Sequence, residues 1–285
     1  MAALRAGAAP GTDPRLTPAR PDLAAERLRG EVEAARYASP VRMRVALGVA
    51  PLRARPGAKG LASELVYGAA FEVYESAGGL AWGQAPRDGY VGYVPAEALE
   101  AANGPATHRV TAPLSHLYPG PDLKTAPLTP LPMNALLSGT IEGAWLVTRH
   151  GCAPAQHVAE AASTVPDWVD AAERFVGAPY LWGGGSALGI DCSGLVQAAR
   201  WAAGFACPRD SDMQSACGTE VAQADLRRGD LVFWKGHVGV MLDGARLLHA
   251  NAHHMACAIE PLAGAIDRIA AGEYGPPTGF RRLEG

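Results

Sequence analysis

The sequence lacks any apolar run approaching the roughly 20 residues that a helix needs to cross a bilayer. It also lacks an excess of basic residues, because 25 lysines and arginines stand against 28 aspartates and glutamates and give a formal net charge of −3. Proteins that bind nucleic acid usually present a broad basic surface. The sequence therefore predicts neither a membrane span nor a nucleic-acid partner.

Regularly spaced cysteines are missing as well. The five cysteines are odd in number and form no CxxC pair, so neither a disulfide framework nor a structural zinc site is expected. His249 and His253 have the spacing of helical metal ligands, but the residues between them are typical of a loop, and no glutamate stands beside them. We predict no metal, no cofactor and a reducing compartment.

The length and the changes of pattern predict several modules, since a domain typically holds about 100–200 residues. Residues 1–36 begin as Gly/Pro-rich coil, and a short helix is expected over Leu23 to Ala35. Short β-type runs separated by turn signals follow in residues 37–102, which is typical of a small β-barrel. A weaker copy of that pattern in residues 103–160 predicts a second, degenerate barrel.

Residues 164–285 have a different order of elements. One helix is expected over Trp168 to Phe175 and another from Cys192 to about Ala203. Three strands follow between Asp230 and Ala250. Helices first and an antiparallel sheet afterwards is an α+β layout, so we predict an α+β domain in this part of the chain.

Cys192 differs from the other four cysteines in its position, after a Gly-rich loop and at the start of the second expected helix. The positive end of a helix dipole and the unpaired backbone amides of the first turn lower the pKa of a thiol there. The same amides can hold an oxyanion. Cys192 is therefore the predicted nucleophile, and the other cysteines are predicted to be packed apolar residues.

A nucleophilic cysteine needs a base and a group that orients the base, and both come from distant parts of a sequence. His237 begins one apolar strand and His249 ends the next, with a turn at Asp243 and Gly244 between them. If the two strands pair as a hairpin, the histidines fall at matching ends and touch. The hairpin would then supply both the base and its orienting group.

In this order the residues resemble the NlpC-type endopeptidases, papain-like cysteine enzymes that hydrolyse peptidoglycan stem peptides. The resemblance covers about Trp168 to Arg282. The motifs that carry it are Tyr180-x-Trp182-Gly183-Gly184, Asp191-Cys192-Ser193-Gly194, Arg228-Gly229-Asp230-Leu231-Val232-Phe233, His237-Val238-Gly239-Val240 and His249-Ala250. It implies a papain-like fold and cleavage of the bond between γ-D-glutamate and the diamino acid.

The resemblance also implies a role for individual residues. Cys192 is the implied nucleophile, His237 the general base and acid, and His249 the residue that orients His237. Tyr180 matches a tyrosine that lines the site near the oxyanion. The residues implied to bind the substrate lie beside or near the nucleophile: Asp191, Ser193 and Ser211.

The barrel of residues 37–102 resembles a bacterial SH3-like module, with Leu52 to Pro56 at its start and Asp88 to Pro95 near its end. In relatives that combine such modules with this catalytic domain, a tyrosine at the position of Tyr90 caps the active site. It restricts the site to peptides with a free N-terminal L-alanine. Tyr90 is therefore implied to contact the substrate, and the implied role is the recycling of free murein peptides.

Residues Met1 to Tyr37 hold scattered charges instead of the apolar core of a signal peptide, which favours a cytoplasmic protein. Two other hypotheses stay open. One is a periplasmic endopeptidase that remodels intact wall and is inhibited by its own N-terminal segment. The other is a non-catalytic protein that binds wall peptides.

Overall fold

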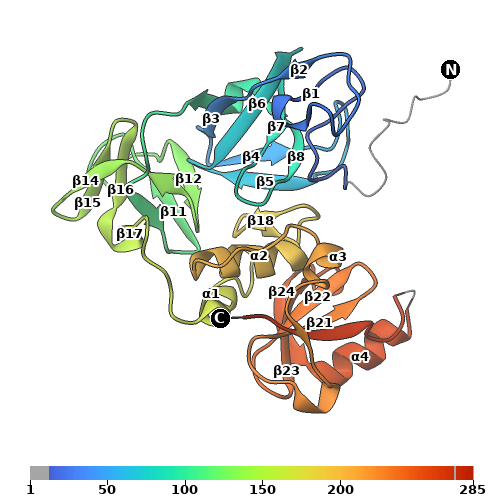
Figure 1. Ribbon diagram of the computed structural model, residues 1–285. Coiled ribbons are helices and arrows are strands. Elements are labelled where there is room, and N and C mark those ends of the chain that lie inside the picture. The colour runs from blue at the N-terminus through green and yellow to red at the C-terminus, as the bar shows by residue number, and fades with distance from the viewer. Residues whose placement is uncertain (1–12, 273, 285) are drawn as a thin grey trace. The chain divides into compact units, whose positions relative to one another are not determined.

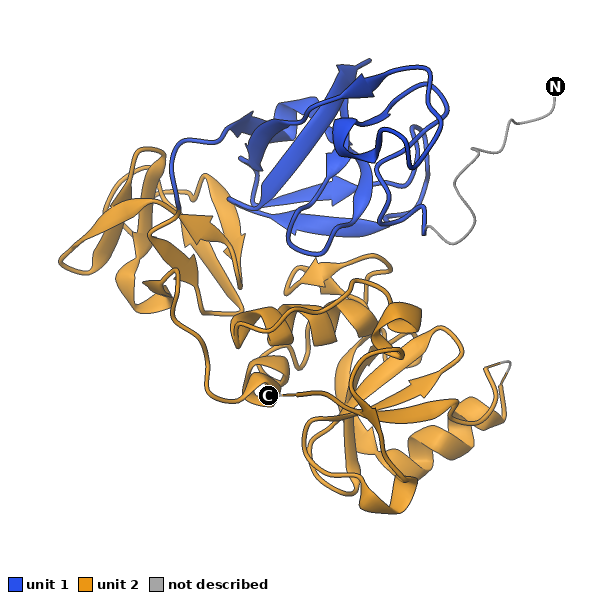
Figure 2. Ribbon diagram, viewed as in Figure 1, with its two compact units in different colours: residues 1–105 blue, residues 106–285 orange. Residues whose placement is uncertain are grey.

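The computed structural model of the protein describes residues 13–272 and 274–284 (Figure 1). The chain divides into two compact units, residues 1–105 and 106–285 (Figure 2). Within the described ranges, no helix combines the length and the apolar character that crossing a membrane requires.

A small antiparallel β-barrel is the centre of the first unit. Its strands are β3 (Val41–Val45), β4 (Val49–Leu52), β5 (Ser63–Val66), β6 (Ala70–Ala77), β7 (Leu80–Gln84), β8 (Val91–Pro95) and β9 (Leu99–Ala101), with a 3-10 helix at Ala96–Ala98. One sheet has the order β8-β7-β6-β3-β9, and β4 and β5 form a second. Gly78 and Gly79 connect β6 to β7 with φ values of 59° and 78°, the left-handed conformations that tight hairpin turns require. The strands expected in this region are present.

The segment before the barrel, predicted as coil and then a helix over Leu23 to Ala35, is not helical along that length. It forms β1 (Ala24–Ala25), which pairs in parallel with β2 (Tyr37–Ala38), and one 3-10 turn at Glu26–Leu28. Gly30 follows with a φ of 88°, a value that a continuing α-helix cannot contain. The helix prediction is therefore wrong. The first twelve residues of the predicted coil lie outside the described residues.

Burial against the barrel explains why the helical propensity of this segment does not decide its structure. Leu23 and Leu28 are buried in one apolar cluster with Tyr74 and Trp82 of the barrel. The guanidinium of Arg20 lies over the Trp82 ring, 4.3 Å from its centroid. Tertiary packing of this kind routinely overrides local propensity.

The second unit begins with another β module, where a degenerate barrel is expected from the sequence. Its strands are β10 (His108–Val110), β11 (Leu114–Leu117), β12 (Thr129–Pro132), β13 (Leu136–Leu137), β14 (Gly139–Glu142), β15 (Trp145–Thr148), β16 (Gly151–Pro154) and β17 (Val158–Glu160), with a 3-10 helix at Ala155–His157. They pair in the orders β13-β10-β17, β11-β12 and β14-β15-β16. Leu117, Leu131 and Leu146 are fully buried between them.

The rest of the second unit has the α+β layout that the sequence predicts. Its elements are α1 (Trp168–Glu173), β18 (Gly185–Ser186), β19 (Gly189–Ile190), α2 (Cys192–Ala202), α3 (Ser211–Gln214), β20 (Thr219–Glu220), a 3-10 helix (Gln223–Asp225), β21 (Asp230–Trp234), β22 (His237–Met241), β23 (Arg246–Asn251), β24 (Ala256–Pro261), α4 (Leu262–Ala270) and β25 (Gly279–Arg282). The main sheet is antiparallel and has the order β20-β25-β21-β22-β23-β24.

Helices cover both faces of this sheet (Figure 1). In β21, Leu231 and Phe233 belong to the apolar cluster that contains α1 and α2. Val232 and Trp234, which alternate with them, belong to the cluster under α4. Because β21 is buried on both faces, its residues from Leu231 to Trp234 are all apolar. Helix α2 packs against the middle strands of the sheet.

The second β module holds the C-terminal end of α2. Arg109 donates a hydrogen bond from Nη2 to the carbonyl of Ala202 (2.8 Å), and Asn134 donates from Nδ2 to the carbonyl of Ala198 (2.9 Å). The Ala202 carbonyl lies in the last turn, where backbone carbonyls lack intrahelical partners and a cation complements the helix dipole. The module therefore contributes a cap to the helix that begins at Cys192.

Candidate active site

Helix α2 begins at Cys192, and Asp191 is its N-cap residue. The Asp191 carboxylate accepts a hydrogen bond from the backbone N–H of Gly194 (2.7 Å), as aspartate commonly does in this position. Cys192 is 7% exposed, and the backbone N–H groups of Ser193 and Val238 lie close enough to its sulfur to lower the pKa of the thiol. Since Val238 lies in β22, the thiol sits between the start of α2 and the start of that strand.

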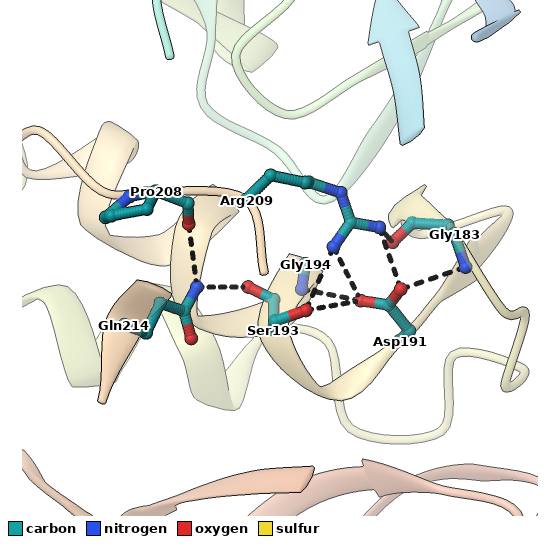
Figure 3. A network of polar contacts seen from close by, with 8 residues as sticks. Gly183, Asp191, Ser193, Gly194, Pro208, Arg209 and Gln214 are labelled. Atoms are coloured by element: carbon teal, nitrogen blue, oxygen red, sulfur yellow. Dashed lines mark hydrogen bonds and ion pairs between the residues drawn. The ribbon is translucent and has the colours of Figure 1, made fainter. Parts of the chain in front are cut away.

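A buried network of polar contacts fixes the start of α2 (Figure 3). Arg209, only 1% exposed, donates to the two carboxylate oxygens of Asp191 at 3.0 and 2.8 Å and to Oγ of Ser193 at 3.0 Å. The backbone N–H of Gly183 also donates to Asp191 (2.9 Å), and Nε2 of Gln214 donates to the carbonyl of Ser193 (3.0 Å). A buried carboxylate needs such partners to offset its desolvation. The network restrains the backbone on both sides of the thiol.

Asp191 and Ser193 are predicted from the sequence to bind substrate. Both side chains are buried, and their polar atoms are engaged in this network, where the Ser193 hydroxyl also donates to Asp191 at 3.3 Å. The structure gives these residues a positioning role at the helix start. Their contact with a substrate stays a prediction.

A hydrogen-bonded chain of side chains begins at His237, the first residue of β22. Its Nε2 is bonded to Nδ1 of His249 in β23 at 2.8 Å. His249 is fully buried, and its Nε2 is bonded to Oε1 of Glu260 in β24 at 2.6 Å. Arg268 of α4 forms an ion pair with the same oxygen. The predicted contact between the two histidines is present, and the fold extends it by a carboxylate and a guanidinium.

The pairing of β22 with β23 explains this contact, in a register other than the expected one. Val240 pairs with Leu248, and continuing that register places Gly239 opposite His249. His237 is thus a diagonal neighbour of His249 on one face of the sheet, a separation that aromatic side chains can bridge. The expectation that the two histidines lie at matching ends of a hairpin is wrong by two residues.

The Glu260 carboxylate determines where the protons of the two rings lie. Its hydrogen bond with His249 lowers the pKa of Glu260 to about 2, so the carboxylate is ionised and only accepts. Nε2 of His249 therefore carries a proton, its Nδ1 is an acceptor, and Nε2 of His237 donates to it. His237 keeps an unprotonated Nδ1, which is the nitrogen that a general base requires.

Burial sets the ionisation of the thiol and of the base. It raises the pKa of Cys192 to about 12, the Asp191 charge adds to the rise, and the two N–H groups near the sulfur oppose it. Burial also lowers the pKa of His237 to about 3, with the neighbouring His249 as the second cause. The lowered thiol pKa expected from the helix start is therefore outweighed by desolvation. The resting site holds a neutral thiol and a neutral imidazole.

The remaining predicted residues lie in three places. Tyr180 is half-buried, and burial raises its pKa to about 12, with nearby Cys192 as the second cause. Its hydroxyl therefore keeps its proton and can donate. Ser211 is the first residue of α3 and is half-buried, two positions after Arg209. Tyr90 belongs to the first unit, where it packs in the barrel core. Contact of Ser211 and Tyr90 with substrate stays a prediction.

Three charged residues of the site are missing from the sequence-based prediction. Arg209 stands in the same short stretch as Ser211, but nothing in the sequence indicates that it would be buried against Asp191. Glu260 follows His249 by eleven residues, and only the register of β23 with β24 puts the two side chains on one face. Arg268 reaches Glu260 from α4, which begins directly after β24 ends at Pro261.

Two parts of the chain match known protein families. The model of the NlpC/P60 family matches residues 177–266, the range that contains the thiol and both histidines. The α+β domain around Cys192 is an NlpC/P60 domain. A second model, the bacterial dipeptidyl-peptidase SH3 domain, matches residues 52–99 of the first barrel. The chain thus combines a region that matches a bacterial SH3 domain with an NlpC/P60 domain, and the predicted family and fold class are confirmed.

Individual relatives agree with this assignment. A γ-D-glutamyl-L-lysine dipeptidyl-peptidase of Bacillus subtilis is 32% identical over 57% of this chain and 60% of its own length. A probable endopeptidase of Corynebacterium glutamicum is 45% identical over 34% of this chain and 48% of its own length. The chain therefore spans 48 to 60% of these two curated relatives. The crystal structure of an NlpC/P60 family protein from Bacillus cereus has the same fold, with a TM-score of 0.69 and 21% identity over 85% of this chain and 99% of that one.

Proposed function

We propose that the NlpC/P60 domain of this chain is a cysteine endopeptidase that cuts peptidoglycan stem peptides between γ-D-glutamate and the diamino acid. The observation that carries the proposal is that the Cys192 thiol lies against Val238 of β22, the strand whose first residue is His237. The thiol lies at a helix start beside β22, and His249 and Glu260 leave the base His237 with a free Nδ1. The name of the Bacillus subtilis relative, a γ-D-glutamyl-L-lysine dipeptidyl-peptidase, supports the choice of bond.

In the first step, the Cys192 sulfur attacks the γ-carbonyl carbon, and the thiol proton passes to Nδ1 of His237. Because thiol and imidazole are neutral at rest, this proton transfer accompanies the attack. The carbonyl oxygen becomes an oxyanion, which the Tyr180 hydroxyl and backbone N–H groups at the helix start stabilise. The positive charge that develops on His237 is balanced through His249 by the Glu260 carboxylate.

In the second step, His237 gives its proton to the nitrogen of the diamino acid as the C–N bond breaks. This leaves a thioester on Cys192. Water, activated by the same imidazole, attacks the thioester and releases a new carboxylate and the free thiol. Every proton that His237 accepts is returned, so the cycle balances with water as the co-reactant.

The proposal includes free stem peptides with an N-terminal L-alanine as the substrates. The match of residues 52–99 to a dipeptidyl-peptidase SH3 domain supports this part, because release of a dipeptide requires recognition of a free N-terminus. Tyr90 is the residue of that domain that we expect to contact the peptide. A cytoplasmic location stays a prediction, which fractionation of cells that produce the protein tests.

The test is mass spectrometry of the tripeptide L-Ala-γ-D-Glu-diaminopimelate, with and without an acetylated N-terminus, incubated with the protein. We expect L-Ala-γ-D-Glu from the free peptide only, and none from Cys192→Ala or His237→Ala. Equal cleavage of both peptides would contradict the role of Tyr90 and favour remodelling of intact wall. If neither peptide is cut by the full chain or by residues 106–285 alone, the peptidase proposal fails in favour of a binding protein.

A further inference from the structure

His249, His254 and Glu260 form a cluster next to the histidine pair. One ligand atom from each lies within 4.8 Å of the others. His249 comes from β23, Glu260 from β24 and His254 from the turn between them. We propose that this cluster is an inhibitory Zn²⁺ site that inactivates the base His237 when it is loaded. The inhibition rests on the proposed peptidase function, whereas the binding does not.

Two imidazoles and one carboxylate are a donor set that zinc prefers, with a fourth position left for water. Histidines that bind metals usually donate their other N–H to an acceptor, which fixes the ring. His254 has that arrangement, because its Nδ1 lies 3.0 Å from Oδ1 of Asn251. Glu260 is fixed by Arg268, and the two bonds to the carboxylate end on Oε1, which leaves Oε2 outside them.

The burial of the three ligands suits a site that exchanges metal with solvent. His249 is fully buried, Glu260 is half-buried and His254 is exposed. His249 and Glu260 are already in contact at 2.6 Å through a proton that a metal ion can replace. Since zinc lies about 2.0–2.2 Å from nitrogen and oxygen ligands, the two side chains need to separate only slightly. His254 then closes the site from the solvent side.

The sequence argues against zinc because it offers only the pair His249 and His253 with no glutamate beside them. The fold changes that donor set. It brings Glu260 from the next strand and uses His254 in place of His253. His253 lies with its ring centroid 4.8 Å from that of His254 but is not among the three clustered ligands.

Occupation of the site reverses the proton order on which the base depends. A zinc ion on Nε2 of His249 leaves the proton of that ring on Nδ1, which then donates to Nε2 of His237. His237 must in turn carry its own proton on Nδ1. The number of protons on the pair is unchanged, but the nitrogen that should accept the thiol proton is occupied. Zinc on His249 therefore blocks the attack by Cys192 without binding the thiol.

Arg268 sets the strength of binding. Its guanidinium contacts Glu260, so it repels a cation there and keeps the site from being permanently loaded. Removal of this charge by Arg268→Gln is expected to tighten zinc binding. Removal of the exposed ligand by His254→Asn is expected to weaken it by roughly tenfold or more, in line with the cost of disturbing metal-ligand shells.

The experiment measures Zn²⁺ binding by competition with a chromophoric chelator and, separately, inhibition of tripeptide cleavage. It uses the full chain, Cys192→Ala, His254→Asn and the matched neighbour His253→Asn. The activity of each active variant in the presence of Zn²⁺ is compared with its activity in the presence of a chelator. We expect one Zn²⁺ per chain, binding retained in Cys192→Ala and in His253→Asn, and both binding and inhibition weakened in His254→Asn. Ca²⁺ should not inhibit, because it prefers oxygen ligands.

Loss of binding in Cys192→Ala with full binding in His254→Asn would overturn the proposal, since zinc would then sit on the thiol and its base. Equal loss in His253→Asn and His254→Asn, or no binding to the full chain, would overturn it too. If the metal-free protein cuts no peptide, the proposed function fails. In that case, Zn²⁺ binding is compared between Cys192→Ala and a variant that also carries His254→Asn, and this comparison still decides whether the site exists.

Discussion

The two ends of helix α2 are held in different ways. At its start, Asp191 and Arg209 form a buried ion pair inside the NlpC/P60 domain. At its end, Arg109 and Asn134 donate to backbone carbonyls from the second β module. A buried ion pair becomes very unfavourable when one partner is lost, whereas a single hydrogen bond to a carbonyl contributes about 1 kcal/mol. The nucleophile is thus positioned locally, and the β module stabilises the helix from its far end.

The largest expected effect comes from removing the cation at the helix start. Arg209→Met leaves the Asp191 carboxylate buried without its guanidinium, and we expect a loss of about 3–5 kcal/mol in the free energy of unfolding. Denaturant unfolding measures it. The control is Arg29→Met, which removes an exposed pair with Glu26 and should leave the unfolding midpoint in place. Equal midpoints for the two variants would show that the network does not fix the helix.

The next effect concerns the proton order of His237 and His249. Glu260→Gln replaces an ionised acceptor by an amide that can donate to Nε2 of His249, so the proton order of the rings reverses. Because general-base catalysis typically contributes about 10²–10⁴-fold, we expect kcat to fall by about 100-fold or more. The matched change Asp267→Asn alters an exposed carboxylate on α4 and should keep kcat. A fully active Glu260→Gln would refute the assigned proton order.

A smaller effect is expected at the other end of α2. Asn134 has a φ of 69°, so Asn134→Ala loses the bond to Ala198 and also strains the backbone. We expect a loss of about 2–3 kcal/mol for alanine and about 1 kcal/mol for Asn134→Gly, which tolerates this conformation. Both variants should retain kcat, because the start of the helix is held separately. A drop in kcat that follows the loss of stability would show that the two ends are coupled.

The smallest perturbation is a change of pH, which tests how burial and the helix start compete at the thiol. Since burial raises the pKa of Cys192 to about 12, the thiolate fraction should rise about tenfold for each pH unit through the neutral range. Alkylation by iodoacetamide, mapped to the peptide that contains Cys192, should rise in the same way. In the denatured chain the rate should level off above the ordinary thiol pKa. A rate independent of pH in the folded protein would indicate a thiolate–imidazolium pair.

The sequence predicts the elements that carry the thiol and the histidines within one or two residues. These elements can be recognised in the sequence because each is a mostly apolar run bounded by glycine, lysine or aspartate: α2, β21, β22 and β23. The sequence does not show which strands pair with one another in the sheet, or in which register. Strand pairing decides that Glu260 faces His249, and no local pattern encodes a register.

In the segment over Leu23 to Ala35, a local pattern is present but does not decide the structure. Its composition favours a helix, but burial of its leucines against Tyr74 and Trp82 of the barrel stabilises the chain more than helix propensity does. The lowered pKa predicted for Cys192 is wrong for a related reason. The helix start is evident from the sequence, while the depth of burial that opposes its dipole arises only from packing against β22.

The most direct test of the central claim is to trap the acyl-enzyme. The protein is mixed with excess L-Ala-γ-D-Glu-diaminopimelate, quenched in acid within the first turnovers, digested and mapped by mass spectrometry. We predict that an L-Ala-γ-D-Glu group appears on Cys192 and that Cys192→Ser abolishes both the adduct and turnover. Turnover that persists in Cys192→Ser, or an adduct on another cysteine such as Cys257, would contradict the assignment of the nucleophile.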